Sequence, residues 1–282
     1  MELVCSVQQY AWGKIGEDSA VASLAKDGEY PGFTLDPSAP YAELWMGTHP
    51  NGPSKLSKTG QLLKDYLDEK PEALGESTRK NFGDQLPFLF KVLSVNKALS
   101  IQAHPDKKLA EVLHAERPDL YKDDNHKPEM IIALTDFEAL CDFRPFSVIR
   151  DHIGQVPQLA RCIGSDWESM SLKDCFTALM KCDPKTVRQE LLSFKDDISA
   201  QSERSFLSDL FLRLHEEYPG DVGCFVIYFL SYHKLVPGEA LFLEANVPHA
   251  YLVLQFSQIN KNINVNIYCS LVDVKWSRQN HS

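Results

Sequence analysis

Three stretches of the 282-residue sequence carry side chains that can bind a metal ion or move a proton. In the first, residues 100–107, Gln102 and His104 lie two positions apart. If this stretch is extended, alternate side chains share a face, so the amide and the imidazole point the same way. Both offer neutral donor atoms to a divalent metal. Pro105 then ends hydrogen-bonded strand pairing directly after His104.

The second stretch, residues 125–130, contains Lys127 and Glu129 on either side of a proline. A residue before proline favours extended geometry, so these two side chains also share a face. A lysine beside a metal-bound carboxylate is a candidate proton carrier, because nearby positive charge favours its neutral form. The third stretch, residues 237–251, predicts a turn, a short apolar strand and a strand entrance at His249.

Each of these residues also has an ordinary structural interpretation. Taken singly, His104 is typical of a hydrogen-bonded structural histidine, Glu129 of a surface or salt-bridged carboxylate, and Lys127 of a solvated charge. His104 and Glu129 are 25 positions apart, and His249 follows 120 positions later. Sequence spacing therefore leaves open whether the three side chains meet.

The elements that must position these residues change in character along the chain. Apolar runs and alternation predict strands over 86–95, 98–103, 130–134, 224–231 and 240–244, whereas helical spacing appears over 106–122 and 147–218. Ser171, Asp183 and Ser205 are candidate helix caps. The order indicates a mixed α+β fold, in which a sheet-forming body is interrupted by a helical insertion. We predict segments at 1–146, 147–219, 220–251 and 252–282.

Composition limits the class of partner. The chain has 29 Lys and Arg against 39 Asp and Glu, a formal net charge of −10, which argues against a broad nucleic-acid-binding face. Its longest apolar run begins at Cys224 and is far shorter than the ~20 residues of a membrane span. The first residues lack a basic signal-peptide region. Seven cysteines without a C-x-x-C pair predict reduced thiols and a cytoplasmic location.

These three stretches resemble the signature segments of the type I phosphomannose isomerases (mannose-6-phosphate isomerases) of eukaryotes. Further matching segments are residues 7–13, 42–49, 86–93 and 220–225. The resemblance is specific, because long segments occur in the family's order from about Gln8 to Tyr251. It implies a cupin-type β-sandwich (jelly roll) with an inserted helical domain and one zinc ion per chain. It also implies interconversion of mannose 6-phosphate and fructose 6-phosphate, which feeds GDP-mannose biosynthesis.

The resemblance also assigns roles to residues. The family's metal ligands correspond to Gln102, His104, Glu129 and His249, and its proton-transfer lysine corresponds to Lys127, with a zinc-held water as the alternative base. An aldose–ketose isomerase must move a proton between C1 and C2 while its metal polarises the carbonyl. The phosphate needs cationic and hydroxyl partners, for which Ser100, Lys91 and Lys107 are candidates. Tyr251, on the face of His249 in an extended chain, is a candidate sugar contact. We expect a monomer that binds a small sugar phosphate.

After Tyr251 the resemblance ends. The family continues with an Asn-Thr-x-Arg-Ala-Gly stretch, whose arginine belongs to the active site, and with a further β-domain; we expect both to be missing here. Alternation at Ile263, Val265 and Ile267 predicts one strand in the divergent tail. Three functions are therefore considered: an isomerase, impaired by the missing arginine; a non-catalytic metal- or ligand-binding form; and, ranked last, an iron oxygenase using two histidines and a carboxylate.

Overall fold

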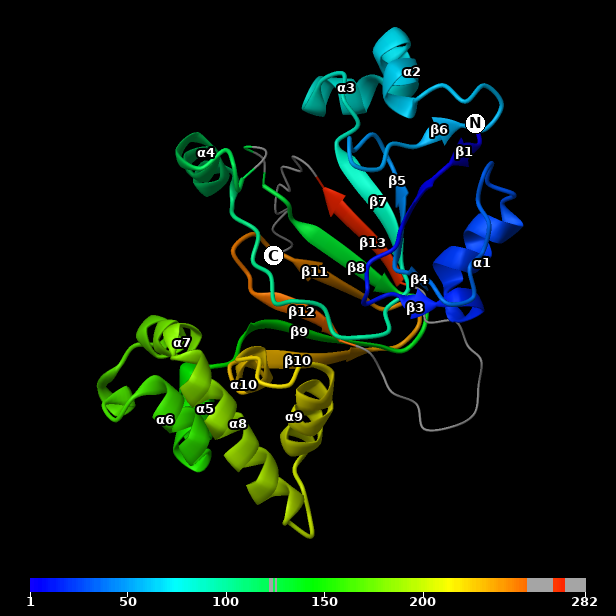
Figure 1. Cartoon of the computed structure of the whole chain (residues 1–282). Helices are drawn as coiled ribbons and strands as arrows, with labels where there is room; N and C mark the ends of the chain where they lie inside the picture. The colour runs from blue at the N-terminus through cyan, green and yellow to red at the C-terminus, as the bar shows by residue number, and fades with distance from the viewer. Residues whose placement is uncertain (122–123, 125, 253–265, 272–282) are drawn as a thin grey trace.

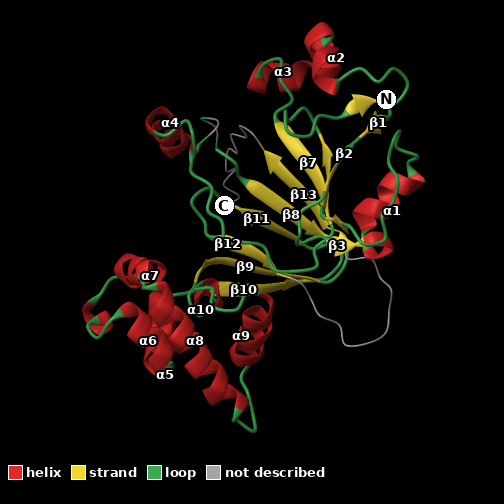
Figure 2. Cartoon of the chain, in the orientation of Figure 1, coloured by secondary structure: helices red, strands yellow, loops and turns green. Residues whose placement is uncertain are grey.

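Two β-sheets face each other in the computed structural model, with helices on their outer sides (Figures 1 and 2). The model describes residues 1–121, 124, 126–252 and 266–271. The strands are β1 (Leu3–Val4), β2 (Ser6–Gln8), β3 (Lys14–Ile15), β4 (Pro40–Tyr41), β5 (Glu43–Met46), β6 (Lys55–Leu56), β7 (Phe88–Leu93), β8 (Glu129–Ala133), β9 (Phe137–Phe143), β10 (Leu230–Leu235), β11 (Ala240–Leu243), β12 (His249–Leu252) and β13 (Asn266–Leu271). The α-helices are α1 (Ala20–Asp27), α2 (Leu63–Glu69), α3 (Glu76–Phe82), α4 (Lys107–Glu116), α5 (Phe146–Gln155), α6 (Pro157–Ile163), α7 (Leu172–Lys181), α8 (Pro184–Ser199), α9 (Phe206–Glu217) and α10 (Gly223–Val226).

The larger sheet has the strand order β11-β8-β13-β7-β5-β2, and the smaller sheet has the order β10-β9-β12. Neighbouring strands in both sheets are antiparallel. β13 lies between β7 and β8. It falls in the tail, for which one strand was predicted. Ile263 and Val265, which also carried that prediction, lie outside the described residues.

The core between the sheets follows from alternation along the strands. Ile131 and Ala133 of β8 face Ala139 and Cys141 of β9 in one buried cluster. Leu140, between the two inward-facing β9 residues, instead joins the cluster formed with the helices. Because successive side chains point to opposite faces, one strand serves two cores. A mixed α+β sandwich with a helical insertion is therefore the observed fold class.

The helices α5 to α9 cover the outer face of the smaller sheet (Figure 1). Three predicted caps are confirmed at their N-termini. The Ser171 side chain accepts a hydrogen bond from a backbone N–H in the first turn of α7, Asp183 does so in α8, and Ser205 in α9. These caps satisfy donors that the first helical turn leaves without partners. None of the helices in the described part of the chain has the length and apolar character needed to cross a bilayer.

The predicted strand over 224–231 is wrong in its first half. Cys224, Phe225 and Val226 form part of the short helix α10, and strand geometry begins only at Leu230. These three residues are at most 2% exposed. A short apolar run that is buried on all sides shows no periodicity, so the sequence cannot separate helix from strand there.

The helical insertion is fastened to the sheet by polar contacts at α9. Arg213 forms a buried ion pair with Glu138 of β9, and the Tyr232 hydroxyl donates to the same carboxylate. At the last residue of α9, the Glu217 carboxylate accepts from the backbone N–H of Ala98 at 2.8 Å. The Tyr218 hydroxyl donates to the Ala98 carbonyl at 2.5 Å. The helices therefore hold both the sheet and the start of the segment that carries Gln102.

We expect Arg213→Leu to lower the free energy of unfolding by about 3–5 kcal/mol, because it leaves a buried carboxylate without its cation. The matched control is Arg204→Leu, which removes an exposed ion pair with Asp209 and should cost less than about 1 kcal/mol. Guanidinium unfolding followed by circular dichroism measures both variants. Equal losses in the two variants would show that the buried pair has no special structural role.

Candidate metal centre

His104, Glu129 and His249 meet at one end of the sandwich, and their donor atoms all lie within 4.8 Å of one another. Glu129 is the first residue of β8 in the larger sheet, and His249 is the first residue of β12 in the smaller sheet. His104 comes from the connection between β7 and α4. Its Nε2 lies 2.8 Å from Glu129 Oε1, and His249 Nε2 lies 3.2 Å from Glu129 Oε2. The two sheets and one loop therefore each supply a donor.

Burial and charge together set the protonation of the cluster. Burial alone raises the pKa of the Glu129 carboxyl, but the two imidazoles beside it outweigh burial and lower that pKa to about 2. Burial lowers the pKa of His249, but the hydrogen bond and charge of Glu129 outweigh burial and raise it. Glu129 is therefore an ionised carboxylate, the form that binds metals.

A backbone carbonyl fixes the tautomer of His249. Its Nδ1 lies 2.9 Å from the Val247 carbonyl oxygen, which can only accept, so Nδ1 carries the proton. In the neutral imidazole, Nε2 then carries the lone pair and faces Glu129. A metal-binding histidine commonly donates its second ring nitrogen to a carbonyl or carboxylate in this way.

The donor set fits a zinc ion. Ligand atoms of a tetrahedral zinc at bonds of about 2.0–2.3 Å stand roughly 3.3–3.8 Å apart, within the range of separations seen here. His104 Nε2 is buried and makes no hydrogen bond of good geometry, although it lies 2.8 Å from Glu129 Oε1. A buried nitrogen that faces a carboxylate without hydrogen-bonding to it is what a shared metal ion would satisfy.

The other predicted residues of the centre lie around this cluster. Gln102 exchanges backbone hydrogen bonds with His249 at 2.8 Å in both directions, and its amide nitrogen lies 3.5 Å from the Ser100 hydroxyl. Both side chains are exposed. Lys127 is half-buried and leads through the buried Pro128 into Glu129. The structure therefore brings His104, Glu129 and His249 together and places Gln102 beside them.

The predicted substrate contacts occupy different environments. The Lys91 ammonium lies 3.3 Å from Glu43 Oε2 and 4.6 Å from the centroid of the Trp45 ring. Its neighbour Val92 packs in the cluster with α1, so alternation directs Lys91 to the inner face of the sheet. Lys107, in the first turn of α4, lies 3.0 Å from Asp124 and 3.6 Å from Glu111.

Tyr251 has a role that sequence reasoning missed. Its hydroxyl donates to Glu129 Oε2 at 3.0 Å, and the side chain is 5% exposed. His249 and Tyr251 lie two positions apart on one strand, so both side chains point to the same face. This spacing could have indicated that Tyr251 also contacts Glu129. Tyr251 positions a candidate metal ligand in the structure.

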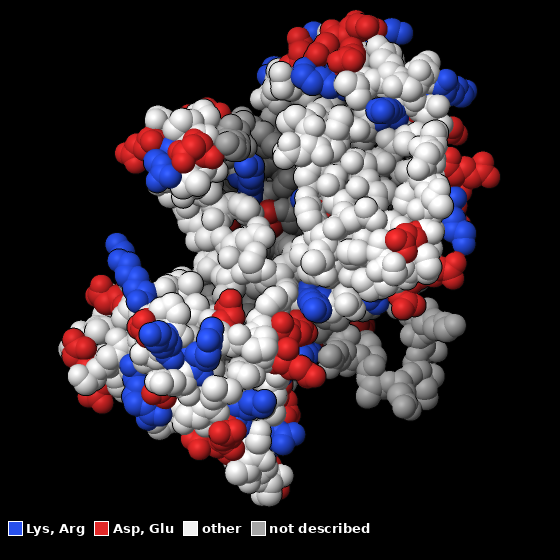
Figure 3. Space-filling model, in the orientation of Figure 1, with Lys and Arg blue, Asp and Glu red and all other residues white. Residues whose placement is uncertain are grey.

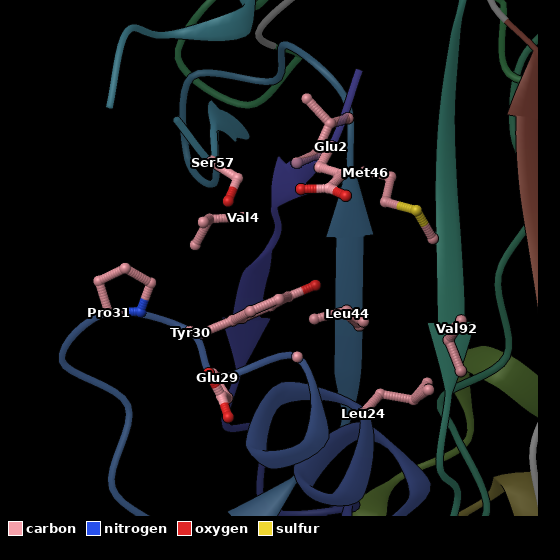
Figure 4. Close-up of a pocket in the computed structure, with 12 residues that line it drawn as sticks. Glu2, Val4, Leu24, Glu29, Tyr30, Pro31, Leu44, Met46, Ser57 and Val92 are labelled. Atoms are coloured by element: carbon pink, nitrogen blue, oxygen red, sulfur yellow. The ribbon is translucent and has the colours of Figure 1, made fainter. Parts of the chain in front are cut away.

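Two hollows of the described surface do not contain the cluster. One, of about 570 Å³, lies over Leu24, Tyr30, Leu44 and Val92 on the outer face of the larger sheet (Figure 4). The other, of about 510 Å³, lies between Ser100 and α9, and its lining has one carboxylate, Asp221, and no Lys or Arg. Figure 3 shows a further hollow between the lobe that carries α4 and the sheet body, and charges of both signs scattered over this view.

A cupin-type sandwich with two histidines and a glutamate at one end defines a candidate metal-binding protein of this fold class. The family model of the type I phosphomannose isomerase catalytic domain matches residues 1–146, and that of the helical insertion domain of the same family matches residues 149–230. The chain therefore belongs to the type I phosphomannose isomerase family, as its sequence segments predicted.

Similar proteins agree with this assignment. Mannose-6-phosphate isomerase of Mus musculus is 47% identical over 272 residues, and that of Schizosaccharomyces pombe is 45% identical over 270. Each match covers 89% of this chain and 64% of the relative, so the chain spans under two thirds of their length. The apo mannose 6-phosphate isomerase of Salmonella typhimurium superposes with a TM-score of 0.77 at 33% identity, covering 96% of this chain and 68% of that one. A mannose 6-phosphate isomerase bound with zinc and yttrium superposes with a TM-score of 0.76 at 33% identity, covering 95% and 67%.

We expect Tyr251→Phe to weaken zinc binding about 10- to 100-fold, because it removes a hydrogen bond that orients Glu129. Competition with a chromophoric chelator measures the dissociation constant. Tyr232→Phe is the matched control, since it also removes a phenol–carboxylate hydrogen bond, but at Glu138. If both variants bind zinc as tightly as the wild type, Tyr251 does not position the metal ligand.

Proposed function

We propose that the chain is a zinc-dependent isomerase that interconverts mannose 6-phosphate and fructose 6-phosphate by enediol proton transfer. The observation that carries the proposal is the convergence of His104, Glu129 and His249 in a chain of this family. Relatives named mannose-6-phosphate isomerase, at 45–47% identity, support the choice of reaction. The proposed setting is a cytoplasmic monomer whose product feeds GDP-mannose biosynthesis.

One zinc ion per chain is the proposed cofactor. His104, Glu129 and His249 would hold it, with Gln102 as the fourth protein ligand. When bound, zinc supplies a Lewis acid that polarises the sugar carbonyl. The superposition on a zinc-bound mannose 6-phosphate isomerase supports zinc over other divalent metals. The carboxylate of Glu129 supplies the negative charge that balances the ion, and the carbonyl of Val247 keeps the lone pair of His249 directed at it.

Lys127 is the proposed proton carrier between C1 and C2 of the sugar. It lies two residues before Glu129, in a segment whose next residue, Pro128, is buried. Proline restricts the backbone of the residue before it, so the ammonium group sits on a stiff segment beside the metal ligand. A positioned group that takes up and returns one proton typically accelerates such a step by about 10²–10⁴-fold.

Substrate recognition is assigned to four side chains. Lys91, on the inner face of the larger sheet, and the Ser100 hydroxyl are proposed to bind the phosphate, and Lys107 is proposed to add charge near α4. A dianionic phosphate attracts the Lys91 ammonium more strongly than the single Glu43 carboxylate does. Tyr251 is proposed to border the sugar from beside Glu129. The segments 1–146, 147–219, 220–251 and 252–282 are the proposed domain organisation.

The alternative function is a metal- or ligand-binding chain without turnover. It is favoured by one sequence observation: residues 252–282 contain no counterpart of the family's Asn-Thr-x-Arg-Ala-Gly stretch. Loss of one group that stabilises developing negative charge costs about 10²–10³-fold in rate. Zinc binding without isomerisation distinguishes this alternative from the isomerase.

We expect the purified chain with added zinc to convert mannose 6-phosphate to fructose 6-phosphate in a coupled assay, and Glu129→Ala to abolish both turnover and zinc binding. The physical reason is that Glu129 supplies the charge that holds the ion. Metal analysis of the same samples gives the zinc content. Bound zinc with no turnover above Glu129→Ala supports the non-catalytic alternative, and a folded chain that binds no zinc contradicts both functions.

Lys127→Met should lower kcat by about 10²–10⁴-fold while leaving the zinc content unchanged, because it removes the proton carrier and no metal ligand. Exchange of the C2 proton of the sugar with deuterated solvent reports the same step. The exposed Lys108→Met is the matched control. Full exchange in Lys127→Met would assign the base to another group.

A further inference from the structure

Asn246 links two turns at the candidate metal centre. One turn follows His104, and the other, which contains Asn246 itself, precedes His249. Its backbone N–H donates to the His104 carbonyl at 2.6 Å. Its side-chain Oδ1 accepts from the backbone N–H of Asp106 at 3.2 Å, and its Nδ2 donates to Asp106 Oδ2 at 2.9 Å. Three hydrogen bonds thus connect Asn246 to His104 and Asp106, and the two to Asp106 join residues 140 positions apart.

The backbone conformation at this position explains why an asparagine suits it. Asn246 has φ of 65°, in the left-handed region that few residues other than glycine and asparagine adopt readily. This conformation lets the N–H of Asn246 meet the His104 carbonyl while its side chain spans the same turn. Glycine could adopt the backbone but could not make the two side-chain contacts.

The same turn also orients His249. The residue after Asn246 supplies the carbonyl that accepts from His249 Nδ1 at 2.9 Å. The carbonyl of Pro248 accepts from the backbone N–H of Asp142 at 2.9 Å, which ties the turn to the end of β9. One turn, residues 246–248, is therefore in contact with both histidine-bearing segments.

We propose that Asn246 is a positioning residue that holds His104 and His249 at the separation the metal ion requires, and so sets metal affinity. This inference rests on the proposed zinc site. Asn246 is itself exposed, so its side chain contributes little packing to the core. Its effect should therefore appear in metal binding and coordination geometry, with little change in the stability of the metal-free protein.

Four variants separate the contributions. Asn246→Gly keeps the left-handed backbone and removes the side-chain contacts. Asn246→Asp keeps an acceptor for the Asp106 N–H but sets two carboxylates against each other. The double variant Asp106→Asn/Asn246→Asp exchanges donor and acceptor and restores the pair, and it leaves an acceptor for the Leu109 N–H at the start of α4. Asn51→Gly is the control at an exposed loop elsewhere.

The experiment measures zinc affinity by chelator competition, the visible spectrum of the cobalt-substituted protein, and thermal unfolding of the metal-free protein. We expect Asn246→Gly and Asn246→Asp to bind zinc about tenfold more weakly with altered cobalt spectra, near-wild-type unfolding midpoints, and recovery to within about threefold in the double variant. Asn51→Gly should match the wild type.

The inference is overturned if Asn246→Gly binds zinc like the wild type, if its loss of affinity is matched by a loss of metal-free stability, or if the double variant fails to recover. A wild-type chain that binds no zinc instead overturns the proposed function. Because no measurement here depends on turnover, these two failures are distinguishable.

Discussion

The buried carboxylate of Glu129 is the constraint on which the rest of the site depends. A carboxylate taken out of water between two apolar sheets costs several kcal/mol unless charged or hydrogen-bonding partners compensate it. Its partners are His104 from a loop and His249 and Tyr251 from the opposite sheet. Packing the two sheets against each other therefore brings this carboxylate two of its partners, His249 and Tyr251. A metal ion would replace direct contacts with the imidazoles by shared coordination, and the buried His104 Nε2 without a hydrogen bond marks where it would bind.

The segment that carries His104 belongs to no named strand, and hydrogen bonds to its backbone hold it in place. Ala98 is fixed from α9 through Glu217 and Tyr218, the Leu99 N–H donates to the Tyr251 carbonyl at 2.8 Å, and Gln102 pairs with His249. The helical insertion thus acts on the site without supplying a ligand. It fixes one end of the segment, while the turn at Asn246 fixes the other. A segment fixed at both ends can hold a ligand in place although it crosses the surface between two elements.

Much of the fold could be predicted from the sequence, because helix and strand patterns depend on residues that are close together in the chain. A short apolar run predicted the strand that became β8, and side-chain chemistry predicted the caps of α7, α8 and α9. The stretch at 224–226 failed because burial on every side removes the pattern. The site was only partly predictable: each ligand stretch was found, but their convergence was inferred from resemblance. The contacts that create it, such as the pairing of His249 with Cys141, depend on strand register across two sheets. Tyr251 was assigned to substrate, and its contact with Glu129 was missed for the same reason.

Holding a metal and turning over a sugar make different demands on this chain. All the donors of the proposed metal centre lie between residues 102 and 249, within strands and loops that the rest of the sandwich supports. Because these donors are far apart in sequence, the chain must fold to bring them together, so metal binding is coupled to folding. Turnover demands more, because charge that develops on the sugar must be stabilised from several sides. The proposed donor set can therefore be complete in a chain whose turnover depends on further groups around the substrate. Metal binding and isomerase activity are therefore tested as two separate properties of this chain.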